Sequence, residues 1–315
     1  MVNIKEITIK YIELINELSN ICAKYELNAT SSRLEEVSVE IKEFKVNVPL
    51  IGSFSSGKTS LINAMLDQKK FAVEVNPETA IPAEIFYSTT PKNFITKSDG
   101  KIIQIDDATL LKNKFLADKD SLLKVSVNHK AFEKFQNINI VDMPGLDSGI
   151  EMHMKAIDNY INKSLAYIMT IDSECGLKNS MINFLNEYKL YNLPAYVLIT
   201  KSDLKLDHEE IEQIINDVKE NINSILGIKE FKIAAVSANN KNISPMIEIL
   251  EEIECRSDEI FTKKYNKVIL LIIEEIEKYI NKRLQSGDLS INEINEQIEK
   301  LKTQISEFEI KLEAE

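Results

Sequence analysis

The chain is poor in cysteine and in long apolar runs. Its 315 residues include 3 cysteines, each isolated in sequence, which gives neither a disulfide framework nor metal-ligand spacing. The longest unbroken apolar run, Val268 to Ile273, is far shorter than the roughly 20 residues that span a bilayer. We therefore expect no disulfide, no cysteine-based metal site and no membrane-spanning segment.

Basic charge is also in deficit. The chain has 38 lysines and arginines against 50 acidic residues, a net charge of -12. Because a negative protein repels the phosphates of nucleic acid, we expect no nucleic-acid partner. Lys5, Glu6 and Lys10 interrupt the apolar residues of the N-terminus, which leaves no signal-peptide core. These features predict a cytoplasmic protein, with a peripheral membrane location for a longer full-length form.

Proline is absent from both ends of the chain, because all 7 prolines lie between residues 49 and 245. Long helices are expected at these ends. After a polar break at residues 28–32, Ser32 and Glu35 fit a capping box that would open a second N-terminal helix. Before the break, apolar residues alternate at spacings of three and four: Ile4, Ile7, Tyr11, Leu14, Leu18, Ile21 and Tyr25.

The C-terminal end repeats this pattern. A broad apolar helix is expected over residues 265–284, followed by a break at 286–288 and another capping box at Ser290 and Glu293. A last apolar stripe then runs to Leu312 without a glycine or proline to close it, so we expect a truncated chain. Since both ends carry stripes that need covering, residues 1–44 and 256–315 are expected to pack as one bundle.

The centre alternates short apolar runs with helical patterns, which predicts mostly parallel strands joined by crossover helices. The expected strands are 45–51, 83–89, 93–96, 101–105, 122–128, 138–141, 165–171, 195–199 and 231–235. The expected helices are 58–66, 151–161, 178–188, 209–226 and 244–253. Ser98, Asp99 and Gly100 fit a hairpin turn between two of the strands.

Two of the 8 glycines fall in one phosphate-binding pattern. Gly52-Ser53-Phe54-Ser55-Ser56-Gly57-Lys58-Thr59 fits GxxxxGK(S/T) between an expected strand and an expected helix. The glycines let main-chain amides face phosphate oxygens, and Lys58 would meet the β- and γ-phosphates. The Thr59 hydroxyl would ligate magnesium, and Ser60 completes the expected nucleotide-binding set.

A second motif selects the base. Thr200-Lys201-Ser202-Asp203 follows an apolar strand and fits (N/T)KxD. Asp203 can accept hydrogen bonds from guanine N1 and N2 together, a donor pair that adenine lacks, and the stem of Lys201 can lie on the base. Ser237-Ala238-Asn239, after the next strand, is suited to offer a main-chain amide to guanine O6. The expected ligands are therefore GTP and GDP.

Two segments between these motifs would sense the γ-phosphate. In Asp142-Met143-Pro144-Gly145, Asp142 should reach magnesium through water and the Gly145 amide should contact the γ-phosphate. Thr79 lies in Asn76-Pro77-Glu78-Thr79-Ala80-Ile81-Pro82, where its hydroxyl would close over magnesium and its carbonyl would position water. These residues predict GTP hydrolysis by in-line attack of water.

GSFSSGKTSLINAML, PETAIP, DMPGLDSG and TKSD, inside a domain with helices on both sides, resemble the dynamin-like large GTPases, most closely the bacterial ones. The motifs carry this resemblance over residues 45–255, and the flanking helices share only the architecture. The implied fold is an α/β P-loop GTPase domain with a mostly parallel sheet at 45–255. Bundle helices at 1–44 and bundle or stalk helices at 256–315 would flank it.

In that family, hydrolysis is weak alone and faster when two nucleotide domains dimerise, and a bundle passes the change to a stalk and a membrane-binding tip. The resemblance thus implies a homodimer or a related dynamin-like partner, with membrane contact outside this chain. Ser55 falls at the family's serine that binds a monovalent cation, K⁺ or Na⁺, and helps to position water. Phe54 replaces the glutamine of eukaryotic dynamin, and Leu146 replaces the glutamine of Ras-type enzymes; neither side chain can hydrogen-bond water.

Two other functions fit the same motifs. One is a small regulatory GTPase of the translation or ribosome-assembly kind, although no basic RNA-binding element is visible in the sequence. The other is a GTP-dependent scaffold whose helices bind a partner with little turnover. Phosphate release would separate the scaffold from an enzyme, and co-sedimentation with liposomes or ribosomes would separate the two kinds of GTPase.

Overall fold

The computed structural model describes residues 4–73, 81–112, 121–147, 157, 160, 164, 166–189, 195–205, 207–227, 231–284 and 298–307. The chain divides into two compact units. The first, the helical unit, comprises Met1–Phe44 with Cys255–Glu315, and the second, the sheet unit, is Lys45–Glu254.

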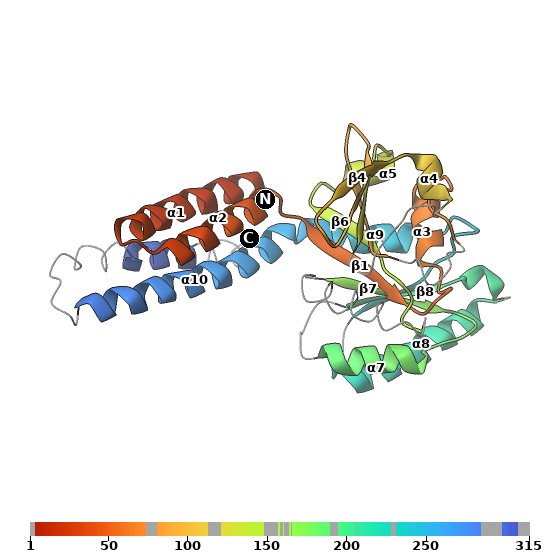
Figure 1. Cartoon of the computed structure of the whole chain (residues 1–315). Helices are drawn as coiled ribbons and strands as arrows, with labels where there is room; N and C mark the ends of the chain where they lie inside the picture. Colours follow the sequence, from red (N-terminus) through yellow and green to blue (C-terminus); the bar gives the residue numbers. More distant parts are fainter. Residues whose placement is uncertain are drawn as a thin grey trace. The chain divides into compact units, whose positions relative to one another are not determined.

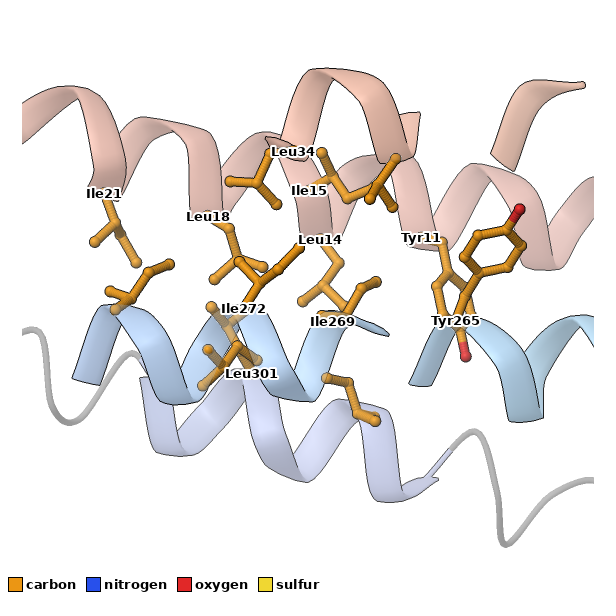
Figure 2. Packing of buried hydrophobic residues seen from close by; sticks show 14 of the residues in the cluster. Tyr11, Leu14, Ile15, Leu18, Ile21, Leu34, Tyr265, Ile269, Ile272 and Leu301 are labelled. Atoms are coloured by element: carbon orange, nitrogen blue, oxygen red, sulfur yellow. The ribbon is translucent and has the colours of Figure 1, made fainter. Parts of the chain in front are cut away.

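The helical unit is a bundle in which both ends of the chain share one core. It contains α1 (Ile4–Lys24), α2 (Asn28–Lys42), α10 (Ser257–Leu284) and a helical segment at residues 298–307. Figure 2 shows side chains of α1, α2 and α10 pointing toward one another, with Leu301 reaching in from the last segment. The core includes Tyr11, Leu14, Leu18, Leu34, Tyr265, Ile269, Ile272 and Leu301.

The spacing of apolar residues explains this bundle. Residues three and four apart share one face of a helix, so each stripe buries a continuous seam against the other helices. The described helices from the two ends of the chain therefore form the helical bundle that the predicted fold class includes. Among the residues that the structure describes, no helix has both the length and the apolar content of a membrane span.

The predicted start of the second N-terminal helix is wrong. Helix α2 begins at Asn28, and its N-cap residue Leu27 makes no side-chain cap hydrogen bond, so Ser32 and Glu35 lie inside the helix instead of capping it. Tertiary contacts explain the earlier start. Glu275 of α10 accepts from the Thr30 hydroxyl at 3.3 Å and pairs with Arg33 at 3.0 Å, so α10 holds the polar segment in the helix.

The described strands of the sheet unit form one nine-stranded sheet in the order β4-β3-β5-β2-β6-β1-β7-β8-β9. The strands are β1 (Val46–Gly52), β2 (Ala83–Tyr87), β3 (Asn93–Thr96), β4 (Ile102–Ile105), β5 (Leu122–Val127), β6 (Ile138–Asp142), β7 (Tyr167–Asp172), β8 (Ala195–Thr200) and β9 (Lys232–Ala235). Strands β6, β1, β7, β8 and β9 run parallel, whereas β2 pairs antiparallel with β6 and β3 pairs antiparallel with β4 and β5.

Helices cover this sheet. The described ones are α3 (Lys58–Met65), α4 (Asp107–Leu111), α5 (Lys130–Glu133), α7 (Asn179–Tyr188), α8 (His208–Leu226) and α9 (Ser244–Cys255), with a short 3-10 turn η3 (Ser202–Leu204). Helices α7 and α8 lie together on one face (Figure 1), where Phe184 and Ile222 pack on Met169 and Val197. The mostly parallel sheet is thus confirmed, and its parallel part brings the carboxyl ends of β1, β6, β7 and β8 to one edge.

Several details differ from the sequence prediction or lie beyond it. Helices α4 and α5 were not predicted, because five and four residues are too few to show a helical period. Helix α10 starts at Ser257, ahead of the predicted residue 265. In the helix predicted at 151–161, residues 157 and 160 are helical and the others lie outside the described residues, as do the break at 286–288 and the capping box at 290–293.

Candidate nucleotide-binding site

The phosphate-binding loop joins β1 to α3, as its pattern predicts, and it requires glycine at one position for space and at another for backbone conformation. A Cβ at Gly52 would lie 2.2 Å from the Thr170 hydroxyl oxygen, so no side chain fits there. Gly57 has a φ of 85° and is the N-cap residue of α3, where no side-chain cap hydrogen bond forms. The first amides of α3 therefore lack a side-chain cap and stand where the positive end of a helix attracts a phosphate.

Lys58 folds back onto this loop. Its ammonium group donates to the carbonyl of Ser53 at 2.9 Å and to that of Gly52 at 3.2 Å. Burial lowers the pKa of Lys58 to about 8, against the nearby carboxylates of Asp142 and Asp147, which favour the charged form. The lysine is thus a buried cation whose hydrogen-bond partners, two carbonyls and the Ser56 hydroxyl, are neutral, and a phosphate would be a stronger partner for it.

Thr59 and Asp142 meet where magnesium is expected. The Thr59 hydroxyl donates to Asp142 Oδ2 at 2.6 Å, while Asp142 Oδ1 is buried without a hydrogen-bond partner. Burial raises the pKa of Asp142, although the Thr59 bond and the charge of Lys58 oppose the shift. An unpartnered carboxylate oxygen beside a hydroxyl supplies the hard oxygen ligands that magnesium prefers, so the residues present fit this ion.

The segment that follows Asp142 packs on the phosphate-binding loop. A Cβ on Gly145 would lie 2.6 Å from the Phe54 nitrogen, and the Leu146 amide donates to the Gly52 carbonyl at 3.1 Å. The Phe54 amide donates to the Asp147 carboxylate, whose other oxygen pairs with Lys178 at 3.0 Å. Although burial acts against ionisation, these two bonds lower the pKa of Asp147. Gly145 is therefore in contact with the loop, as a γ-phosphate sensor must be.

The base motif forms a second cluster at the ends of β8 and β9. The Asp203 carboxylate accepts from the Ser237 hydroxyl at 2.5 Å and from the Asn239 amide at 3.0 Å. These bonds, led by that of Ser237, lower the pKa of Asp203. Ala238 lies between the two donors. The carboxylate is thus held in its charged form, as pairing with guanine N1 and N2 requires.

One residue joins the two clusters. The Thr200 hydroxyl donates to the Ser56 carbonyl at 2.8 Å, and Ser56 in turn shares a hydrogen bond of 2.8 Å with Thr170. Lys201, next in the chain, pairs with Asp172 at 2.6 Å. The phosphate-binding loop and the base motif, far apart in sequence, are therefore one site along the carboxyl edge of the sheet, where α/β folds bind ligands.

Other predicted residues have more varied positions. Ser55 is exposed and has a φ of 65°, and Phe54 is 39% exposed, so its ring does not pack in the core. Leu146 is buried in the core beneath α7 and α8. Ser53 is buried in the loop, and Ser60 lies in the first turn of α3. Thr79 lies outside the described residues.

Sequence reasoning did not single out Asp147, Asp172 or Ser173. Asp147 lies two residues after Gly145. Asp172 ends β7 at the edge that carries the other motifs, and Ser173 follows it. Their position after a predicted strand was the available signal. It was weak, because no known motif marks these residue types there. Among the described residues, no group of three or more His, Cys, Asp or Glu side chains could hold a metal ion without other ligands.

Comparison with known proteins agrees with this geometry. Residues 48–203 match the model of the Dynamin family. The chain is 27% identical over 237 residues to Dynamin-like protein 1 of Campylobacter jejuni, a match that covers 62% of this chain and 32% of the relative. It is 24% identical over 216 residues to the Arabidopsis thaliana protein named Probable transmembrane GTPase FZO-like, chloroplastic, covering 66% of this chain and 21% of the relative. The chain therefore spans less than a third of these two relatives.

A solved structure resembles nearly the whole chain. It belongs to an oligomerised bacterial dynamin pair, described as providing a mechanism for the long-range sensing and tethering of membranes. The TM-score is 0.56 at 18% identity, and the match covers 98% of this chain and 52% of that chain. This likeness shows a shared fold that includes the helical residues as well as the sheet unit.

Proposed function

Since this chain belongs to the dynamin family, we propose that it binds GTP and hydrolyses it to GDP and phosphate. The hydrogen bond from Thr200 to the Ser56 carbonyl carries this proposal. It fixes a loop suited to phosphates beside a motif suited to guanine, so one nucleotide reaches both. A chance match of either motif would not be expected to put the two in contact.

The residues divide the chemistry between them. Lys58 and the loop amides would stabilise the negative charge that develops on the phosphoryl oxygens as water attacks in line. When bound, magnesium neutralises phosphate charge, and Thr59 and Asp142 would hold it, joined by Thr79 in the GTP state. The Thr79 carbonyl and a monovalent cation at Ser55 would orient the water, since the Leu146 side chain is buried and apolar.

GTP binding would be coupled to shape through Gly145. The backbones of Gly145 and Phe54 are packed so closely that a Cβ on Gly145 would not fit between them. A shift of Gly145 toward a γ-phosphate would therefore move the phosphate-binding loop as well. We expect that movement to control pairing of two GTPase domains, either of two copies of this chain or with a related dynamin-like partner. The assembly of the oligomerised bacterial dynamin pair supports this expectation.

The full-length protein would work in membrane remodelling. The support is the naming of one relative as a transmembrane GTPase and the description of the bacterial dynamin pair as sensing and tethering membranes. We assign membrane contact to sequence outside these 315 residues, because a net charge of -12 gives little attraction to anionic lipid. The chain itself is expected to act in the cytoplasm and to stay in the supernatant when mixed with liposomes.

The test is phosphate release from GTP and from ATP, measured over a series of protein concentrations. Lys58→Ala is the inactive variant, and Lys134→Ala, which alters an exposed ion pair with Glu251, is the matched control. We expect release from GTP alone, with a rate per molecule that rises with protein concentration.

Each other outcome points to a different account. Equal turnover of ATP would contradict the assignment of Asp203. A rate per molecule that does not change with protein concentration would contradict activation by dimerisation, but it would be consistent with GTP hydrolysis by the single chain. Tight GTP binding without release would favour the scaffold, and co-sedimentation with ribosomes would favour the small regulatory GTPase.

A further inference from the structure

We propose that Asp172 and Ser173, which lie outside the known motifs, position Lys201 under the purine base and so determine guanine-nucleotide affinity. Asp172 Oδ2 pairs with the Lys201 ammonium at 2.6 Å. The Ser173 hydroxyl donates to the Lys201 carbonyl at 3.0 Å. These two neighbouring residues thus hold both ends of one lysine. The inference rests on the proposed function, because it concerns how that site holds its base.

Lys201 needs such support because of its backbone. Its φ of 56° and ψ of 34° lie in the left-handed region, which is unfavourable for any residue with a Cβ. The end of β7 lies beside it, since Asp172 is paired in register with Thr200, and the Ser173 amide donates to the Thr200 carbonyl at 3.1 Å. Ser173 therefore fixes the residues on either side of the peptide that enters the strained conformation.

The Asp172 carboxylate is itself immobilised. Its second oxygen, Oδ1, accepts from the Glu174 amide at 2.9 Å. The side chain is 8% exposed, compared with 35% for Lys201. A fixed, buried carboxylate holds the ammonium group in place, and the more exposed methylene stem is left to contact an aromatic base.

A general structural role would have different consequences. If Asp172 contributed only to the stability of the fold, its replacement would lower that stability, and any loss of nucleotide affinity would be the same whether or not Lys201 was present. If it acts by positioning Lys201, its effect on nucleotide affinity must vanish once Lys201 is shortened. A double-mutant cycle separates the two, because it measures the coupling of one residue with the other.

The experiment measures the affinity of the full chain for fluorescent GDP with magnesium. Asp172→Asn keeps the shape but removes the charge, and Ser173→Ala removes the hydroxyl. We expect about 10- to 100-fold weaker binding for the first and a few-fold weaker binding for the second, as typical for charged and neutral hydrogen bonds. Glu210→Gln is the matched control, because it removes a carboxylate that pairs with Lys205 at 3.1 Å, near Lys201 in sequence.

In the Lys201→Ala background, Asp172→Asn should change the affinity less than about twofold. The melting temperature of the nucleotide-free protein provides the second readout, and it should change no more for Asp172→Asn than for Glu210→Gln. Wild-type affinity in Asp172→Asn, or an equal loss with and without Lys201, would overturn this inference alone. Failure of the wild type to bind GDP would overturn the proposed function and this inference together.

Discussion

The phosphate end and the base end of the candidate nucleotide site hold their binding groups in place through different kinds of contact. At the phosphate end, Lys58 bonds to loop carbonyls, Thr59 bonds to Asp142, and the Phe54 amide bonds to Asp147. These are groups that a bound nucleotide and its magnesium would need, so binding must exchange one set of partners for another.

At the base end, the supports come from side chains that can stay in place. Asp172 pairs with the Lys201 ammonium group. Ser237 and Asn239, after the end of the neighbouring strand β9, donate hydrogen bonds to the Asp203 carboxylate. This comparison indicates that the base end is largely shaped in advance, whereas nucleotide binding would require the phosphate end to rearrange. Such an arrangement would let the protein keep its choice of base while its contacts with the γ-phosphate change.

The largest effect is expected at the phosphate end. Lys58→Ala should weaken GDP and GTP binding about 1000-fold, because it removes charged hydrogen bonds to two phosphates in a buried site. Equilibrium binding of fluorescent nucleotides measures this change. Lys134→Ala should bind as the wild type does, and a deficit of tenfold or less in Lys58→Ala would show that the loop does not hold phosphates.

Removal of the Asp142 charge should have the next largest effect. In the presence of magnesium, Asp142→Asn is expected to lower GTP affinity about 10- to 100-fold. It should also reduce the difference between the GTP affinities measured with magnesium and with EDTA. Asp217→Asn, on the exposed face of α8, is the control. An unchanged gap between the two assays would mean that Asp142 has no part in holding the ion.

The link between the two ends can be cut separately. Thr200→Val removes the hydroxyl that bonds to the Ser56 carbonyl and leaves that buried oxygen with one partner fewer. We expect about tenfold weaker GDP binding, while Thr200→Ser, which keeps the hydroxyl, should lose much less. A loss in Thr200→Ser with none in Thr200→Val, which keeps the γ-methyl group, would point to packing of that methyl group instead of the hydrogen bond.

A smaller effect should follow pH. The pKa of Lys58 is lowered to about 8 by burial, and phosphates should raise it again on binding. GDP affinity should therefore fall severalfold between pH 7.5 and about 9, and binding near pH 8.5 should take up protons. Calorimetry in two buffers of different ionisation enthalpy measures that uptake; its absence would contradict the account of Lys58.

The same group should affect the stability of the nucleotide-free protein in the opposite direction. An unfolded lysine titrates near about 10.4, so between pH 8 and 10.4 the unfolded chain binds more protons than the folded one. The contribution of Lys58 to the free energy of unfolding therefore rises with pH through that window, because its buried charge is being lost. As the pH rises through this window, GDP affinity should fall while the contribution of Lys58 to the free energy of unfolding rises.

How far the sequence predicted these features depended on how local they are. Gly52, Lys58 and Asp203 sit in motifs a few residues long, and the apolar stripes of α1 and α10 repeat within each helix. Asp172 acts on Lys201 across two strands, and Glu275 reaches Thr30 from another helix. Such pairs follow from the packing of distant segments, which no local pattern encodes. The start of α2 was wrongly predicted for that reason.

The most direct test of the guanine-nucleotide site is competition of GTP, ATP and XTP against fluorescent GDP, for the wild type and for Asp203→Asn. Asp203 would pair with two donors that guanine has and adenine lacks, and an amide at this position would instead suit the extra carbonyl of xanthine. We predict that GTP displaces the probe from the wild type while ATP does not, and that XTP becomes the stronger competitor for Asp203→Asn. Equal displacement of the probe from the wild type by ATP and GTP would contradict the account.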